Sequence, residues 1–229
     1  MDERQNIIDN LEQMKIGVDE PFKFHCTMCG KCCLNREDIL LNPRDIYGMA
    51  KELGMTTAVF FRTYCETYLG NNSRFPIVRL KPRGSIKRCP LLKDHKCSVH
   101  KSKPTVCAMF PIGRCIEFSD KKQDITYVFI NPDCGDESET HTVREWLSEF
   151  GIPLVDDFYI KWNKVLMKMS EAFRKAEKRV RKDIMDKVWS ATLAALYLEY
   201  DTDQEFMPQF EENSVRMLTL VQLLEKGGK

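Results

Sequence analysis

The stretch FHCTMCGKCCLN places four cysteines within eight consecutive residues, at positions 26, 29, 32 and 33. A C-x2-C-x2-C run folds into a tight loop whose thiolates converge on one side, and ferredoxin-type loops hold three irons of a 4Fe-4S cluster at this spacing. Gly30 suits such a loop, because a chain that wraps a metal often needs a positive φ or a close backbone approach. Lys23, Lys31 and Arg36 lie nearby in the sequence and would lower the thiol pKa values, as metal binding requires. The stretch therefore predicts a loop that binds an iron-sulfur cluster.

Cys33 is expected to serve a different cluster from Cys32, because adjacent side chains diverge in extended backbone. In two-cluster ferredoxins, a cysteine beside one triplet ligates the other cluster. The later segment CPLLKDHKCSVHKSKPTVC supplies three more thiols, which are Cys89, Cys97 and Cys107. Together with Cys33 they would complete a second set of four. Two 4Fe-4S clusters are therefore favoured over one.

The first triplet still lacks a fourth ligand. Cys134 in NPDCGD is the candidate, and Cys115, which begins a predicted strand, is the alternative. No catalytic residue is identified. The predicted cofactor-binding and metal-ligating residues are Cys26, Cys29, Cys32, Cys33, Cys89, Cys97, Cys107 and Cys134.

Zinc is the alternative cofactor, because it also accepts four thiolates in a tetrahedral site. Zinc ribbons present two CxxC knuckles, one for each half of the site, whereas only the first half of this constellation has that form. The corresponding alternative function is a structural zinc-binding adaptor that uses its helical tail for docking.

The composition of the chain indicates its cellular compartment and the classes of partner that it binds. The chain has 229 residues and a formal net charge of +1, so its charge predicts neither nucleic-acid nor membrane binding. It starts with an acidic, polar stretch and has no run of about 18 apolar residues that could span a membrane. We therefore expect a cytoplasmic protein with a protein partner. In a reducing compartment its ten cysteines are expected to bind metal rather than form disulfides.

Several other residues that could carry chemistry have simpler interpretations. Cys65 lies on the aromatic face of a predicted helix and is expected to be a small buried apolar residue. His25, His95 and His100 flank ligand cysteines, but such histidines more often donate hydrogen bonds around a site or face solvent. His141 is expected at the surface. The run RKAEKRVRK is interpreted as a solvated helix face rather than a phosphate-binding patch.

The elements that position the cysteines are predicted to be short. NPRDIYGMAKELG predicts a helix in which Asn42 caps, Pro43 and Asp45 occupy the first turn, and Gly54 ends the helix. A second helix follows from Thr57, with its aromatic residues as far as position 68 on one face. RFPIVRL predicts a strand, and CIEFS and ITYVFI predict a hairpin around DKKQD.

The part without cysteines is predicted to be helical. Apolar residues from Trp162 to Val180 recur at steps of three and four along a helix that begins near Asp157. DIMDKVWSATLAALYLEY predicts a buried helix, DTDQEFMPQF a break, and FEENSVRMLTLVQLLEK a last amphipathic helix. The expected fold is α+β, a small irregular cysteine-rich domain with short strands packed against a C-terminal helical bundle. The expected parts are a helical segment 1–22, a cysteine-cluster domain 23–150 and a helical region 151–229.

The ordered cysteines of CTMCGKCC and CPLLKDHKCSVHKSKPTVCAMFPI resemble the YkgJ-type CxxCxxCC cysteine-cluster family, described as zinc- or iron-chelating. The resemblance spans Phe24 to Cys134, and LYLEYDTDQEFMPQFEEN resembles the tail of stand-alone members. Two departures are Lys103-Pro104, where the family often has Arg-Pro, and Cys134-Gly135, where it often has Cys-Pro-Gly.

The resemblance implies iron or zinc binding at the matching cysteines. Because the family includes flagellin lysine N-methylase proteins, it also implies an alternative function as a protein-lysine N-methylase-like enzyme that uses S-adenosylmethionine. The residues do not add support, since neither a G-x-G-x-x-G loop nor a C-x3-C-x2-C triplet is present. The favoured function is iron-sulfur binding for electron transfer, sensing or maturation of another protein.

Overall fold

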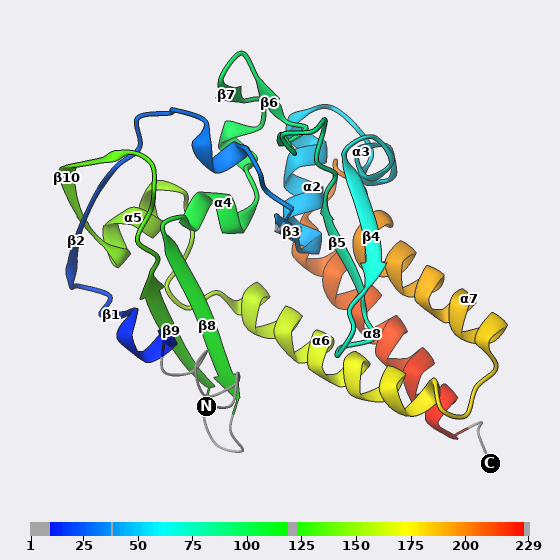
Figure 1. The fold of residues 1–229 in the computed structure, drawn as a ribbon. Helices are drawn as coiled ribbons and strands as arrows, with labels where there is room; N and C mark the ends of the chain where they lie inside the picture. Colours follow the sequence, from blue (N-terminus) through cyan, green and yellow to red (C-terminus); the bar gives the residue numbers. More distant parts are fainter. Residues whose placement is uncertain (1–9, 38, 119–122, 227–229) are drawn as a thin grey trace.

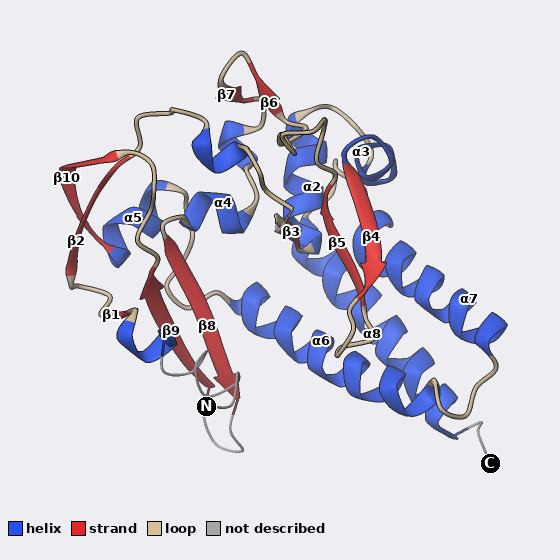
Figure 2. Ribbon diagram, viewed as in Figure 1, coloured by secondary structure: helices blue, strands red, loops and turns tan. Residues whose placement is uncertain are grey.

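The computed structural model describes residues 10–37, 39–118 and 123–226 (Figure 1). The β8–β9 and β2–β10 strands lie at one end of the molecule, and the longer helices lie at the other, beside the sheet of β4 and β5 (Figure 2). The predicted α+β class, with a cysteine-rich part of short strands and a helical C-terminal region, is confirmed. No helix in the described part of the chain is both long and apolar enough to cross a membrane.

Within the described residues, the strands form four small antiparallel sheets. One has the order β1-β9-β8 (Lys15–Ile16, Gln123–Phe129, Ile112–Phe118), and a second pairs β10 with β2 (Asp136–Thr142, Pro21–His25). A third has the order β3-β5-β4 (Leu40–Leu41, Pro76–Leu80, Cys65–Leu69), and β6 pairs with β7 (Leu92–Lys93, Lys96–Cys97). The predicted hairpin is β8 and β9, in register from Ile112 opposite Phe129 to Phe118 opposite Gln123.

The helices are short near the cysteines and long in the C-terminal region. They are η1 (Lys31–Cys33), α2 (Pro43–Glu52), α3 (Thr57–Tyr64), η2 (His100–Ser102), α4 (Thr105–Met109), α5 (Val143–Glu149), α6 (Asp157–Ala176), α7 (Lys182–Leu193), the π-helical η3 (Ala194–Leu198) and α8 (Phe206–Lys226).

Two hydrophobic cores divide the molecule. The larger core joins α2, α3 and the β3-β5-β4 sheet to α6, α7, η3 and α8, with Phe60, Phe75, Phe173 and Tyr197 almost fully buried. The smaller core lies between β2, β8, β9 and α5 around Trp146. The cysteine-bearing middle of the chain therefore shares one core with the C-terminal helices. The domain boundaries at 22/23 and 150/151 remain predictions.

Local signals predicted α2 correctly. The Asn42 side chain accepts a hydrogen bond from the Asp45 N–H, and the Asp45 carboxylate accepts one from the Asn42 N–H. These two bonds satisfy backbone donors that a helix start leaves unpaired. Gly54 follows the last turn with a φ of +62°, which suits a residue without a Cβ.

The second predicted helix is shorter than expected. α3 ends at Tyr64, and the chain continues as β4, in which Tyr68 is exposed and pairs with Ile77 of β5. Tyr68 therefore does not share the aromatic helix face. The physical reason is the full antiparallel pairing between β4 and β5, which satisfies the backbone of residues 65–69 better than one more turn of helix. Cys65 starts the strand but is buried, as expected.

The helical region also departs from the prediction at two points. The sequence predicts that one helix continues as far as Val180, but α6 ends at Ala176 and the chain turns before α7. Val180 and most of the RKAEKRVRK run therefore lie in this turn. Like charges spaced four apart in this run disfavour a longer helix. α8 begins at Phe206, inside the predicted break, because the Phe206 ring packs on Phe210 at a centroid distance of 5.7 Å.

Candidate metal centre

The CxxCxxCC loop ends in a turn of 3-10 helix, η1, entered through Gly30 at a φ of +74°. The predicted positive φ at Gly30 is confirmed. The Cys33 N–H donates to the Gly30 carbonyl at 2.9 Å, and the Sγ atoms of Cys32 and Cys33 lie 3.9 Å apart. The expectation that these two side chains diverge in extended backbone is therefore wrong. In 3-10 backbone, with three residues per turn, adjacent side chains point about 120° apart rather than in nearly opposite directions as in a strand, so the two sulfurs can approach each other.

The distal cysteines reach this loop through backbone hydrogen bonds. The Cys89 N–H donates to the Cys33 carbonyl at 2.8 Å, and the Asn35 N–H donates to the Ile86 carbonyl at 3.0 Å. The β6–β7 hairpin then places Cys97 opposite Leu92, and α4 carries Cys107. These three cysteines pack, half-buried, against the larger core.

Cys134 approaches the same loop from the other side, just before β10. The Lys31 Nζ donates to the Asp133 carbonyl at 3.3 Å. Hydrogen bonds from the backbone of Lys31, and more weakly of Gly135, hold the pKa of Cys29 below its usual value. The thiolate of Cys29 is therefore stabilised by the segment that contains Cys134.

The backbone geometry at Gly135 disfavours any residue that has a Cβ atom. Its φ is +75°, and a Cβ there would lie 2.4 Å from the His25 carbonyl oxygen and 2.7 Å from Phe24 Cε2. Real Cβ atoms do not approach backbone oxygen so closely. A glycine after Cys134 thus lets the chain approach His25 closely where β10 begins to pair with β2, next to Cys134.

Electrostatic interactions link the eight thiols, and we divide them into two sets according to the two clusters that the sequence predicts. Burial and the charges of Cys32 and Cys29 raise the pKa of Cys134 to about 11, and the charge of Cys26 adds to this. We call these four the first thiol set: Cys26, Cys29, Cys32 and Cys134. The second thiol set is Cys33, Cys89, Cys97 and Cys107, and burial together with the charge of Cys32 raises the pKa values of all four.

Cys32 lies between the two sets. Its charge also acts on Cys89, Cys97 and Cys107 in the second set. A hydrogen bond from the Cys33 thiol, opposed by burial and helped by Arg36 and Lys103, lowers the pKa of Cys32 to about 6. Cys33 correspondingly has a raised pKa. The two adjacent thiols therefore differ in acidity, with Cys32 the more acidic of the pair.

The eight predicted ligand cysteines lie on three segments that contact one another through the Cys89–Cys33 and Lys31–Asp133 hydrogen bonds, and their role as ligands stays a prediction. All ten cysteines are free thiols. Cys65 is buried in the larger core, and burial alone raises its pKa. Cys115 lies in β8, where burial and Glu117 raise its pKa and Lys15 opposes them. Among the described residues no three Cys, His, Asp or Glu side chains lie close enough together to hold a metal ion as they stand.

The histidines lie around the site rather than in it. His25 Nδ1 lies 3.3 Å from the Asp136 carboxylate, and His95 and His100 are exposed. The expectation that His141 is at the surface is wrong. Its side chain is only 14% exposed, because the ring packs edge-on against Trp146 at a centroid distance of 4.9 Å.

Lys103 contributes to the site and was not singled out by the sequence. Its charge lowers the pKa values of Cys32 and Cys97, and its ammonium also lies 4.0 Å above the Phe150 ring. The only sequence signal was its position four residues before Cys107, at the point where the family often has arginine. A cation at this position serves the thiolates whether it is lysine or arginine.

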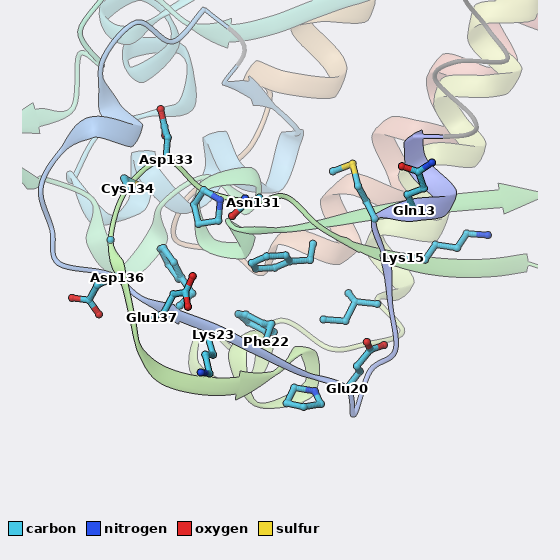
Figure 3. A pocket seen from close by; sticks show the side chains of 17 residues that line it. Gln13, Lys15, Glu20, Phe22, Lys23, Asn131, Asp133, Cys134, Asp136 and Glu137 are labelled. Carbon is cyan, nitrogen blue, oxygen red and sulfur yellow. The ribbon is translucent and has the colours of Figure 1, made fainter.

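A hollow of about 620 Å³ opens beside the first thiol set (Figure 3). Cys134 and Asp133 lie at one end of it, and Lys15 from β1 and Phe22 from β2 line other parts. Solvent and small molecules can therefore approach the Cys134 side of the centre.

Comparison with known proteins agrees with the chemistry of this site. Residues 25–135 match the family model described as "CxxCxxCC: Putative zinc- or iron-chelating domain", and the match includes all eight clustered cysteines. Among curated proteins and among solved structures, none matches this chain. Residues 25–135 of this chain thus match the CxxCxxCC family, whose domain is described as zinc- or iron-chelating.

Proposed function

We propose that the protein binds iron-sulfur clusters of the 4Fe-4S type, one at each thiol set. The residues that would hold the first are Cys26, Cys29, Cys32 and Cys134, and those that would hold the second are Cys33, Cys89, Cys97 and Cys107. A bound cluster would supply one-electron redox chemistry at this position. The chain itself supplies thiolates, backbone N–H donors and nearby cations.

The observation that carries the proposal is the grouping of eight thiols from three separate segments. Thiolate charges on neighbouring cysteines repel one another, and burial opposes their ionisation. Without metal the buried thiols therefore stay protonated, and they must lose these protons to bind a metal. Lys103 and Arg36 offset only part of the charge. Iron in the clusters would neutralise the rest, since metal ligands must be deprotonated.

The role that follows is electron transfer, sensing or maturation of another protein, in a reducing compartment such as the cytoplasm. Ten free cysteines in one chain support that location, because reducing compartments keep thiols free for metal. The hollow beside Cys134 and the exposed edge near Cys97 leave the centre accessible to small oxidants and to a partner.

A structural zinc site is a second candidate, supported by one distance. Two thiolates on a tetrahedral zinc lie about 3.8 Å apart, as follows from a zinc–sulfur bond of about 2.3 Å. The Sγ atoms of Cys32 and Cys33 are separated by 3.9 Å. Zinc could therefore use both members of this pair in one site. The S-adenosylmethionine enzyme rests on the family resemblance alone.

Anaerobic purification followed by iron, acid-labile sulfide and zinc analysis tests the proposal. We expect a brown protein with about eight irons and eight sulfides per chain, as two cubane clusters require. The Cys65→Ser variant is the matched control, because this thiol is buried in the larger core away from the sets. A colourless anaerobic protein with stoichiometric zinc and no sulfide would refute iron-sulfur binding and establish the zinc site.

A further inference from the structure

The segment from residue 81 to residue 103 is strongly basic. It contains eight lysine and arginine residues and one aspartate, a net charge of +7, whereas the whole chain carries +1. We call it the basic segment. The rest of the chain must therefore carry a net charge of about −6, so the charge of this protein is concentrated rather than mixed.

The cations of the basic segment face solvent. Seven of the eight are exposed, namely Lys81, Arg83, Lys87, Arg88, Lys93, Lys96 and Lys101. Within the part of the chain that the structure describes, Lys87 has an ion pair with Glu37, and Lys93, Lys96 and Lys101 have no carboxylate within ion-pair distance. Most of the positive charge is therefore not neutralised by the protein itself.

The basic segment lies directly against the candidate metal centre. It contains Cys89 and Cys97, and the hydrogen bond from the Cys89 N–H to the Cys33 carbonyl joins it to the cysteine loop. The β6–β7 hairpin, which carries Lys93 and Lys96, projects from the molecule above this loop (Figure 1). A partner seated on these lysines would cover the edge of the second thiol set.

The opposite flank of the cysteine loop has the opposite charge. Residues 133–139, which we call the acidic loop, contain four carboxylates and no cation, and all four are exposed. The contact between Lys31 and the Asp133 carbonyl joins this loop to the same cysteine turn. The candidate metal centre thus lies between the basic segment, with a net charge of +7, and the acidic loop, with a net charge of −4.

We infer that the basic segment is the docking face for an electron-exchanging protein partner with an acidic surface, which covers the edge of the centre near Cys97. This inference rests on the proposed redox function of the site. A long polyanion such as a nucleic acid or an anionic membrane would meet the acidic loop as well as the basic segment. A compact acidic protein can satisfy the lysines alone, and the acidic loop then fixes its orientation by repulsion.

The test uses a plant-type ferredoxin, a small acidic protein with one 2Fe-2S cluster, as the probe. Binding of dye-labelled oxidised ferredoxin to the full chain is followed by fluorescence anisotropy at several salt concentrations. The test variant carries Lys93→Glu, Lys96→Glu and Lys101→Glu. The control variant carries Lys178→Glu, Arg179→Glu and Lys187→Glu, three exposed cations at or beyond the α6–α7 turn, at the far end of the helical region.

Both triple variants change the net charge from +1 to −5, so a difference between them reports the location of the charge. We expect the test variant to weaken ferredoxin binding at low salt by about tenfold or more, and the control variant by less than about threefold. A further variant with the same three lysines changed to glutamine should fall between the wild type and the test variant. All residues changed are exposed, so thermal melting should agree among the proteins.

Equal binding by the test and control variants would overturn the inference. The inference would also be overturned if a 20-base-pair duplex, or vesicles containing phosphatidylserine, bound in a way that depends on the three lysines while ferredoxin binding did not. Anisotropy does not require a bound cluster in this protein. A preparation without iron would therefore refute the proposed function while the docking face was still measured.

Discussion

The clearest prediction concerns Gly135, which connects Cys134 to β10. An alanine there meets two obstacles, a left-handed φ of +75° and a Cβ only 2.4 Å from the His25 carbonyl oxygen. The φ costs about 1–2 kcal/mol for a residue with a Cβ. Forcing a methyl group against packed backbone costs about 1–3 kcal/mol more. Gly135→Ala should therefore lower the free energy of unfolding by about 2–5 kcal/mol.

Gly30 provides a matched control in the same centre. Its φ is +74°, nearly the same, but a Cβ there would meet nothing within 4 Å. Gly30→Ala should therefore cost only the backbone contribution of about 1–2 kcal/mol. Asparagine separates the two effects further, since it tolerates the left-handed region. Gly30→Asn should be close to neutral, whereas Gly135→Asn should remain destabilised by the contact with His25.

The change at Gly135 should also reach the metal. Relief of the contact requires β10 to move from β2, and Cys134 lies immediately before Gly135. We expect Gly135→Ala to lose about half of the iron if each thiol set holds a cluster, while Gly30→Ala retains it. Anaerobic urea unfolding and metal analysis measure the two effects. Equal stability and equal metal content in the two alanine variants would refute the geometric reasoning.

Three other predictions follow from the fold and the thiol sets. Although burial opposes ionisation, Arg44 and Arg114 hold the pKa of Asp156 below its usual value, so its contribution to stability is present above about pH 4 and is lost as the pH falls through its folded pKa. Asp156→Asn keeps the side-chain oxygen that caps α6 but removes the charge, so it should lower the free energy of chemical unfolding by about 2–4 kcal/mol at pH 7. The variant should also lose less stability than the wild type as the pH falls. An unchanged dependence of stability on acid pH would contradict this. Cys134→Ser should lose metal and Cys115→Ser should not, by metal analysis, and the reverse result would exchange the two assignments. Chelation of the metal should leave most of the helical signal at 222 nm in circular dichroism, because α6, α7 and α8 pack in a core made largely of other side chains, and a complete loss of that signal would contradict it.

Local sequence signals predicted the elements that are decided locally. The Asn42–Asp45 capping pair, the β8–β9 hairpin and the start of α6 depend on neighbouring residues, and all three agree with the structure. The predictions of element boundaries are wrong where contacts with residues distant in the sequence determine the structure. β4 replaces the end of a helix because β5 pairs with it, and α8 starts early because Phe206 packs in the larger core.

The candidate site shows the same division. The spacing of the cysteines selects eight of ten as ligands, which stays a prediction; the structure adds that the three segments carrying them contact one another. The close approach of Cys32 to Cys33 depends on a 3-10 turn that no pattern in the sequence indicated. The part played by Lys103 depends on chain packing around Phe150, 47 residues away in sequence, which periodicity does not report.

The pairing of β2 with β10 has a consequence for how this module can be inherited and engineered. The family segment begins at His25 and ends at Gly135, and His25 is the strand partner of Asp136. Its two ends therefore lie side by side, as in segments that can be inserted into a loop of a host protein without disturbing the host chain. The inserted segment would still present the apolar residues of α2 and β5, including Ile46 and Val78, to its surroundings. A host must therefore supply helices that cover this face, as α6, α7 and α8 do in this protein.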